Sequence, residues 1–242
     1  MGWPPDDHEQ PDCQDGVVAL SDAPSDVNEL IEAGRDREAA EWGAAGPVSS
    51  EGTAMDPISQ LGQLGPHLSR VVAGITPDQL GNPTPCAGFT VSGVLEHMIG
   101  GATTFAAAYR GDQSTEPDLV DPLGSFGPVL GDLVAAITTP GALDRTVQAP
   151  FGEVLGDSFC RFVVLDGLVH GWDLATATDQ SYEPPDELVA DAFEFARQTI
   201  DSLRDGDTFA QAVAPAVGAS PIERLANYTG RRGPTGERSN TN

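Results

Sequence analysis

Several stretches between residues 55 and 230 place apolar residues every three or four positions, which is the spacing of one helix face. Asp56-Pro57 and Asp121-Pro122 have the form of an N-cap followed by proline at the first helical position. Thr90 precedes another such stretch, and Ser220–Glu223 has the spacing of a capping box. We therefore predict helices at 57 to about 74, 90 to beyond 105, 122 to about 138, 157 to about 178, 186 to about 203 and 220 to 230.

Four of these helices are long and have short or medium connections, which favours an all-α fold: an antiparallel four-helix bundle followed by C-terminal helices. Residues 145–154 differ, because two short β-like pieces flank Pro150-Phe151-Gly152. They predict a small hairpin. The alternative, an α/β sheet, would need repeated Val/Ile-rich strands that the sequence lacks.

Charge divides the chain into three parts. Residues 1–54 hold 13 acidic residues and two arginines and have few apolar residues, so we expect a disordered acidic extension. Residues 55–230 form the expected helical domain. Residues 231–242 are again poor in apolar side chains and are expected to be a flexible tail.

Composition excludes several classes of protein. All 12 basic residues are arginine, so a lysine Schiff base and a P-loop lysine are ruled out. The net charge of −25 makes nucleic acid and anionic membranes poor partners. No stretch is long and apolar enough to span a bilayer. Three distant cysteines and the lack of a signal sequence lead us to expect a cytoplasmic protein.

Asp166 and His170 are four residues apart in a predicted helix and therefore share one side, about 5–6 Å apart at Cβ. His97 lies beside Val94 and Met98 on another apolar face. Two imidazoles and a carboxylate, with room for water, are typical of a catalytic divalent-metal site. The alternative is an ordinary hydrogen bond along one helix and a histidine satisfied in the core.

Asp173 follows His170 by three residues and also faces the bundle interior. It could be a fourth metal ligand, or it could hold the His170 ring in place from behind. It could equally form an ion pair with one of the arginines.

Two motifs carry a resemblance to a known family. Residues 82–98 (NPTPCAGFTVSGVLEHM) resemble its "PTPC-x-x-W-T-V … L-x-x-H" opening, and residues 165–178 (LDGLVHGWDLATAT) resemble its "D-x-x-x-H-x-W-D-L-A-x-A-T-G-Q" signature. Residues 221–231 resemble the family's ending. The family is the metal-binding group related to mycothiol-dependent maleylpyruvate isomerase, in the DinB-like four-helix-bundle superfamily. The resemblance covers roughly residues 55–231.

The resemblance implies a divalent ion, usually zinc, held by His97, Asp166 and His170. It also implies mycothiol as a thiol partner in S-transfer or thiol-assisted isomerisation. Two departures bear on the site, since Asp166 stands where the isomerases have Glu and Phe89 where they have Trp. A third, Asp179 in place of Gly, falls where a left-handed helix cap is expected.

The expected function is therefore a divalent-metal-binding, thiol-dependent transferase or isomerase, and the alternative is a non-catalytic metal-binding sensor or interaction module. The expected second substrate is electrophilic or anionic, and Arg224 could hold an anionic one as a bidentate fork or pair with an acidic residue. Cys86 could take part in thiol exchange or simply pack. A homodimer is left open.

Overall fold

The structure is a computed structural model that describes residues 55–149, 152–206 and 209–233. The expected extension at 1–54 and residues 234–242 of the expected tail at 231–242 lie outside these residues. The helices are α2 (Pro57–Ala73), α3 (Val91–Arg110), α4 (Pro122–Ile137), α5 (Gly156–Ala177), α6 (Asp186–Thr199) and α7 (Pro221–Tyr228), with 3₁₀ turns η1 (Pro77–Gln79) and η2 (Ile200–Gly206). The all-α fold predicted from the sequence is confirmed.

Helices α2, α3, α4 and α7 begin at the predicted caps. Asp56, Thr90 and Asp121 each accept a hydrogen bond from the backbone N–H three residues later, at 2.9, 3.2 and 3.1 Å. Ser220 and Glu223 form both halves of a capping box at the start of α7. These side chains satisfy backbone donors that the first helical turn leaves without partners. Local chemistry therefore fixes where the elements begin.

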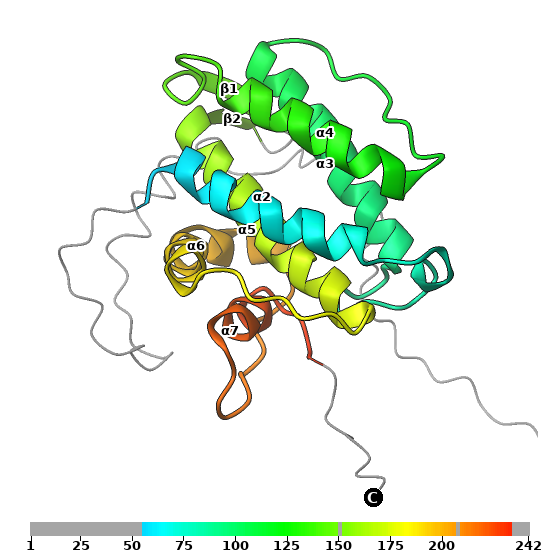
Figure 1. The fold of residues 1–242 in the computed structure, drawn as a ribbon. Coiled ribbons are helices and arrows are strands. Elements are labelled where there is room, and N and C mark those ends of the chain that lie inside the picture. Colours follow the sequence, from blue (N-terminus) through cyan, green and yellow to red (C-terminus); the bar gives the residue numbers. More distant parts are fainter. Residues whose placement is uncertain (1–54, 150–151, 207–208, 234–242) are drawn as a thin grey trace, which may run out of the picture.

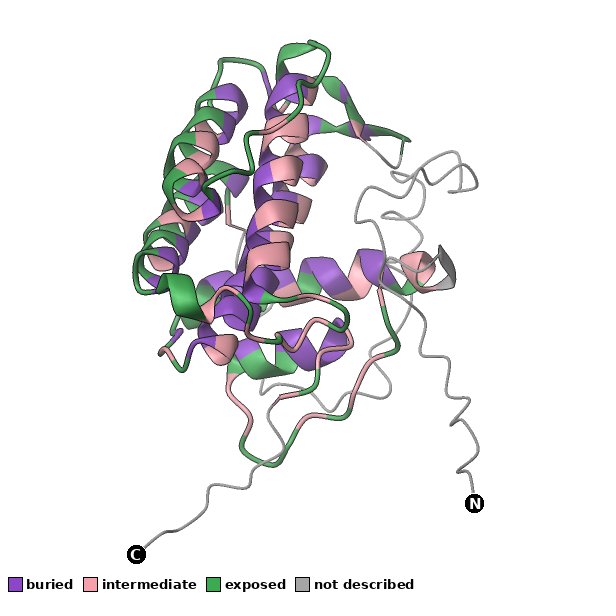
Figure 2. Ribbon diagram, turned by 90° about the vertical axis from the view of Figure 1, so that its right-hand side faces the viewer, coloured by how far each residue is buried: buried purple, intermediate pink, exposed green. Residues whose placement is uncertain are grey.

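Helix α5 is the central element of the molecule (Figure 1). Helix α2 packs on α5 and α4 packs on α3, while α3 also contacts α5, so these four helices enclose one core. Helices α6 and α7 pack on α5 and on each other, on the side away from α4 (Figure 1). Most of α5 is consequently buried, whereas α4 exposes much of its outer face (Figure 2).

Two glycines allow α5 to be covered closely. A Cβ atom at Gly167 would lie 2.8 Å from Cδ2 of Leu64 in α2. One at Gly171 would lie 2.5 Å from the Tyr182 hydroxyl. Real Cβ atoms do not approach so closely, so a larger residue at either position would force the Leu64 or Tyr182 side chain to shift. This packing fixes the helix that carries the candidate site.

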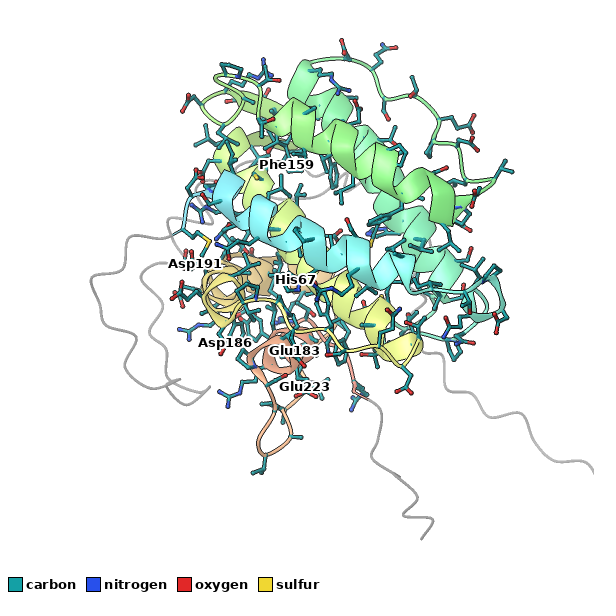
Figure 3. All side chains as sticks on the ribbon, in the orientation of Figure 1. His67, Phe159, Glu183, Asp186, Asp191 and Glu223 are labelled. Atoms are coloured by element: carbon teal, nitrogen blue, oxygen red, sulfur yellow. The ribbon has the colours of Figure 1, made fainter. Side chains whose placement is uncertain are left out.

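The expected hairpin is also present. Strands β1 (Thr146–Ala149) and β2 (Gly152–Leu155) pair antiparallel, with Val147 opposite Val154. Both valines are buried against the bundle, whereas the residues beside them are largely exposed. The hairpin therefore closes the end of the core where Phe159 lies among the helices (Figure 3).

The chain leaves α5 in a left-handed conformation. Asp179 has φ of 55°, and it is the one non-glycine residue with positive φ in the described part of the chain. Its substitution for the family's glycine therefore leaves the left-handed cap in place, since aspartate tolerates this region better than most residues.

The outer surface around α6 and α7 carries acidic side chains. Glu183, Asp186, Asp191 and Glu223 lie there (Figure 3), and Asp191 accepts a hydrogen bond from the Gln60 amide at 3.2 Å. None of the helices in the described ranges combines the length and apolarity that crossing a membrane would require.

Candidate metal centre

The structure brings His97, Asp166 and His170 together. His97 projects from α3, and Asp166 and His170 project from successive turns of α5. Their ligand atoms all lie within 4.8 Å of one another, and the two imidazole rings meet edge to face with centroids 4.8 Å apart. The predicted convergence of these three residues is therefore seen in the fold.

The distances within this group are long for hydrogen bonds and compatible with a shared ion. Nε2 of His97 lies 3.5 Å from Oδ1 of Asp166, and Nε2 of His170 lies 3.4 Å from the same oxygen. Both exceed the 2.7–3.2 Å of a good N–H···O hydrogen bond. Tetrahedral ligands about 2.1 Å from a zinc ion are about 3.4 Å apart. The donor set and its spacing therefore fit a divalent cation.

The site opens toward solvent on one side. The Asp166 side chain is 40% exposed and that of His97 is 25% exposed, whereas that of His170 is 7% exposed. Phe89 lies edge-on to His97, with ring centroids 6.0 Å apart. The three residues thus leave an accessible position beside them, as catalytic rather than structural metal sites do.

The other nitrogen of His170 faces a closed cluster. Nδ1 lies 3.1 Å from Oδ2 of Asp173, which is fully buried. Because a carboxylate only accepts hydrogen bonds, Nδ1 is the donor, and in the neutral ring the Nε2 lone pair is then directed at the three-residue group. Asp173 thus holds the ring from behind and is not part of the group formed by His97, Asp166 and His170.

Arg231 completes this buried cluster. Its Nε lies 3.4 Å from Oδ2 of Asp173, and its Nη2 lies 3.5 Å from Sγ of Cys86. The guanidinium also donates to the Thr229 carbonyl at 3.2 Å. Both the ring-holding role and the arginine ion pair considered for Asp173 therefore occur together.

Cys86, His170 and Asp173 also bring possible metal-binding atoms within 4.8 Å of one another. Here, however, the Arg231 guanidinium already contacts the sulfur and the carboxylate, and a second cation would be repelled. We therefore place the candidate metal centre on the Nε2 side.

Sequence reasoning missed Arg231, which was assigned to the start of the flexible tail. Its side chain is only 12% exposed and packs against α5. The Gly-Arg ending of the resemblance was the one signal that could have marked it. Arg224, the arginine that was considered, lies exposed on α7 and donates from Nε to the Ala219 carbonyl at 3.1 Å. Its proposed contact with a substrate remains a prediction.

Protons and a metal ion would compete for the same nitrogen and oxygen atoms. Burial alone would lower the pKa of His170, but the negative charge of the nearby Asp166 carboxylate and the hydrogen bond with Asp173 outweigh it and raise this pKa to about 9. Burial would raise the pKa of Asp166, but His170 and His97 together lower it. Because Asp166 is partly exposed, water weakens this effect. A metal ion would thus replace a proton on His170.

The mostly helical fold, with its two-stranded hairpin, fits a DinB-like protein. Residues 61–149 match the family model described as mycothiol maleylpyruvate isomerase N-terminal domain. The chain is also 32% identical, over 182 residues, to two uncharacterized proteins of Mycobacterium tuberculosis, Rv0738 of strain H37Rv and MT0763 of strain CDC 1551. Each match covers 73% of this chain and 98% of the relative.

The chain therefore belongs to the mycothiol maleylpyruvate isomerase N-terminal domain family, a DinB-like family. The matched model includes His97 and ends before α5, whereas the match to the two relatives spans most of the chain. No solved structure gives a significant match.

Proposed function

We propose that the protein is a metal- and thiol-dependent enzyme, an S-transferase or isomerase that uses mycothiol. A divalent ion, zinc in our proposal, would be held by His97, Asp166 and His170. The observation that carries the proposal is the spacing of 3.4 and 3.5 Å between the histidine nitrogens and the shared Asp166 oxygen. This spacing suits a common cation better than hydrogen bonds.

The family supports the choice of thiol, since its description names mycothiol. A zinc ion at this position would supply the positive charge that lowers the pKa of a thiol and makes it a thiolate at neutral pH.

The chain's own residues have separate tasks in this proposal. Asp173 keeps the proton of His170 on Nδ1, and Arg231 holds Asp173 in place. His97 and Asp166 lie at the exposed side, where a thiol can reach the centre from solvent. The closed cluster thus orients the ligands and the open side admits the reactant.

Metal analysis followed by a thiol titration tests the proposal. Purified full-length protein should contain about one zinc per chain, and the His97→Ala variant should contain much less. After replacement of zinc by cobalt, mycothiol should change the d–d spectrum. If metal binds but mycothiol leaves the cobalt d–d spectrum unchanged, the protein is a non-catalytic metal-binding module. If no metal binds, the proposal is wrong.

A further inference from the structure

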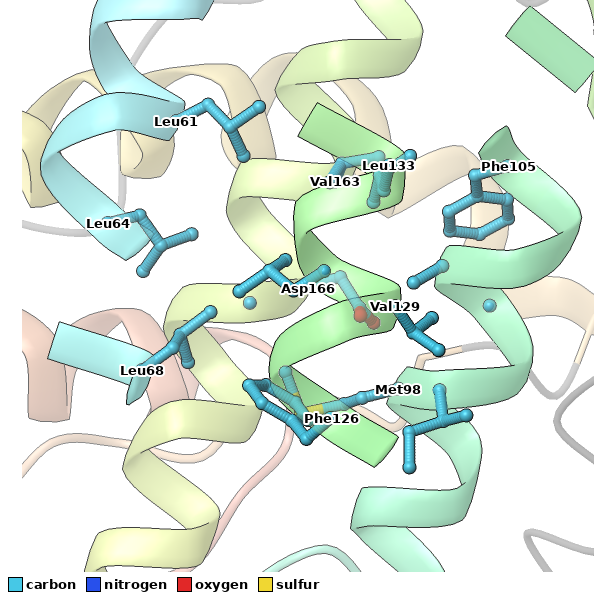
Figure 4. Close-up of a pocket in the computed structure, with 15 residues that line it drawn as sticks. Leu61, Leu64, Leu68, Met98, Phe105, Phe126, Val129, Leu133, Val163 and Asp166 are labelled. Carbon is cyan, nitrogen blue, oxygen red and sulfur yellow. The ribbon is translucent and has the colours of Figure 1, made fainter. Parts of the chain in front are cut away.

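A narrow apolar cavity borders the candidate metal centre. It lies among α2, α3, α4 and α5, and Figure 4 shows Asp166 reaching into it from α5 between leucine, valine and phenylalanine side chains. Of the 15 residues that line it, Asp166 alone has a polar side chain. The remainder of the wall is hydrocarbon or aromatic.

The cavity extends along α3. Its wall on α3 runs from Met98, next to His97, to Phe105, and seven residues of helix span about 10 Å. Water centres can occupy only about 40 Å³ of it. That exceeds the ~10–15 Å³ needed for one water but is far below the ~150 Å³ of a cavity that takes benzene. A linear chain fits this space better than a ring.

The charges around the cavity determine which ligands can enter it. No cationic side chain lines the cavity among the described residues, and its one charge is the Asp166 carboxylate. The chain as a whole carries −25. Arg231, on the other side of His170, already contacts Asp173 and Cys86. An anion buried here would have no partner and would lose its hydration, which costs several kcal/mol.

We infer that this cavity binds the linear alkyl part of an uncharged electrophile, with the reactive carbon at the Asp166 end. The inference rests on the proposed function and names the class of its second substrate. In the transfer, the thiol gives its proton to solvent and its sulfur forms a bond to the electrophilic carbon. The bond from that carbon to the leaving group breaks, and the leaving group departs with the electron pair.

A matched pair of substrates tests the inference with the zinc-loaded full chain and mycothiol. 1-Bromohexane and 6-bromohexanoate share the same reactive carbon and chain length, but only the second carries a carboxylate that would lie deep in the cavity. After subtraction of the uncatalysed rate, thioether formation should have kcat/KM at least about tenfold higher for 1-bromohexane. Equal or reversed values would overturn the inference.

A larger side chain inside the cavity should slow the reaction of the alkyl substrate and leave metal binding unaffected. Ala102 lines the cavity, so Ala102→Leu should lower kcat/KM for 1-bromohexane about tenfold or more while zinc content stays unchanged. Ala135→Leu makes the same change on the exposed face of α4 and should have no effect. Unchanged kinetics in a folded Ala102→Leu protein would count against the cavity.

A second variant covers the case in which Ala102→Leu fails to fold through overpacking. Leu130 lines the cavity and is only half-buried, so Leu130→Ala should lengthen the available space. The preferred 1-bromoalkane should then become one or two carbons longer than in the wild type. An identical preference in both proteins would place the substrate elsewhere.

Binding to metal-free protein separates this inference from the proposed function. By calorimetry, 1-hexanol should bind at least about tenfold more tightly than hexanoate, and Ala102→Leu or Leu130→Ala should alter its affinity. If 1-hexanol binds in this way but the zinc-loaded protein transfers no thiol, the cavity assignment stands and the enzyme proposal fails. If thiol transfer occurs but hexanoate binds as well as 1-hexanol, the cavity assignment fails alone.

Discussion

The two nitrogens of His170 face very different surroundings. Nε2 lies 3.4 Å from Asp166, in a group with His97 that is spaced too widely for good hydrogen bonds and partly open to solvent. Nδ1 lies 3.1 Å from Asp173, which is fully buried and contacted by Arg231. In our proposal the first side holds a cation and admits a reactant, whereas the second is filled by side chains that hold the ring.

The comparison explains why both sides are needed. A neutral imidazole can bind a cation through one nitrogen only if its proton is kept on the other. Asp173 fixes that proton, and Arg231 neutralises the carboxylate that would otherwise be a buried charge. The closed side thus determines what the open side can bind.

Replacing His170 should abolish the stabilisation that zinc gives to the folded protein. In wild-type protein, zinc at 100 times its Kd should add about 2.7 kcal/mol of stability, and His170→Ala should remove that gain. Melting temperature with zinc or with a chelator measures it. His67→Ala is the matched control, because His67 lies edge-on to Tyr182 and outside the group. If chelator leaves wild-type melting unchanged and His170→Ala destabilises regardless of metal, His170 is a core hydrogen-bonding residue.

The same substitution on the two sides should have different consequences. Asp166→Asn removes the charged ligand and should weaken zinc binding well beyond 100-fold. It should lower chelated stability at neutral pH but hardly above pH 9, because Asp166 raises the pKa of His170. Asp173→Asn should weaken zinc binding only about 10–100-fold. It should also cost roughly 3 kcal/mol with or without zinc, because Arg231 loses its buried counter-charge. Equilibrium zinc titration and denaturant unfolding give the two quantities. Identical profiles for the variants would contradict the division into two sides.

The pKa of His170 predicts a pH-dependent stability for chelated protein and a nearly level stability for zinc-loaded protein between about pH 6.5 and 9. Because the pKa is raised from 6.5 to about 9 in the fold, its stabilising contribution is complete below about pH 6.5 and is lost as pH rises toward 9. Chelated protein should therefore lose up to about 3 kcal/mol across that interval. Zinc affinity should rise over the same interval, since binding displaces the proton. Urea titrations at several pH values check both trends, and parallel trends would show that His170 does not ligate the ion.

Local signals predicted most of the fold. Asp56, Thr90 and Asp121 were recognisable as caps because their hydrogen bonds reach only three residues along the chain. Asp166 and His170 were recognisable as neighbours because helix geometry alone places them one turn apart. His97 required the further step of matching an apolar face on another helix.

The remaining parts of the site depend on tertiary packing. Arg231 lies 58 residues after Asp173, and its place in a polar, glycine-flanked ending looks like a tail until α7 is packed on α5. The cavity beside Asp166 likewise forms only where α2, α3, α4 and α5 pack together and leave space between their side chains. No spacing along one helix could predict either feature.

The smallest expected effect concerns Cys86, on the closed side. Its sulfur belongs to the second group of possible ligand atoms, yet Arg231 lies 3.5 Å from it. If the guanidinium occupies that side as we infer, Cys86→Ser should change zinc affinity less than about threefold and stability by no more than about 1 kcal/mol. The cobalt protein should also show no sulfur-to-metal charge-transfer band before a thiol is added. A band that disappears in Cys86→Ser, together with a large loss of affinity, would move the metal to the Nδ1 side of His170 and reverse the roles of the two faces.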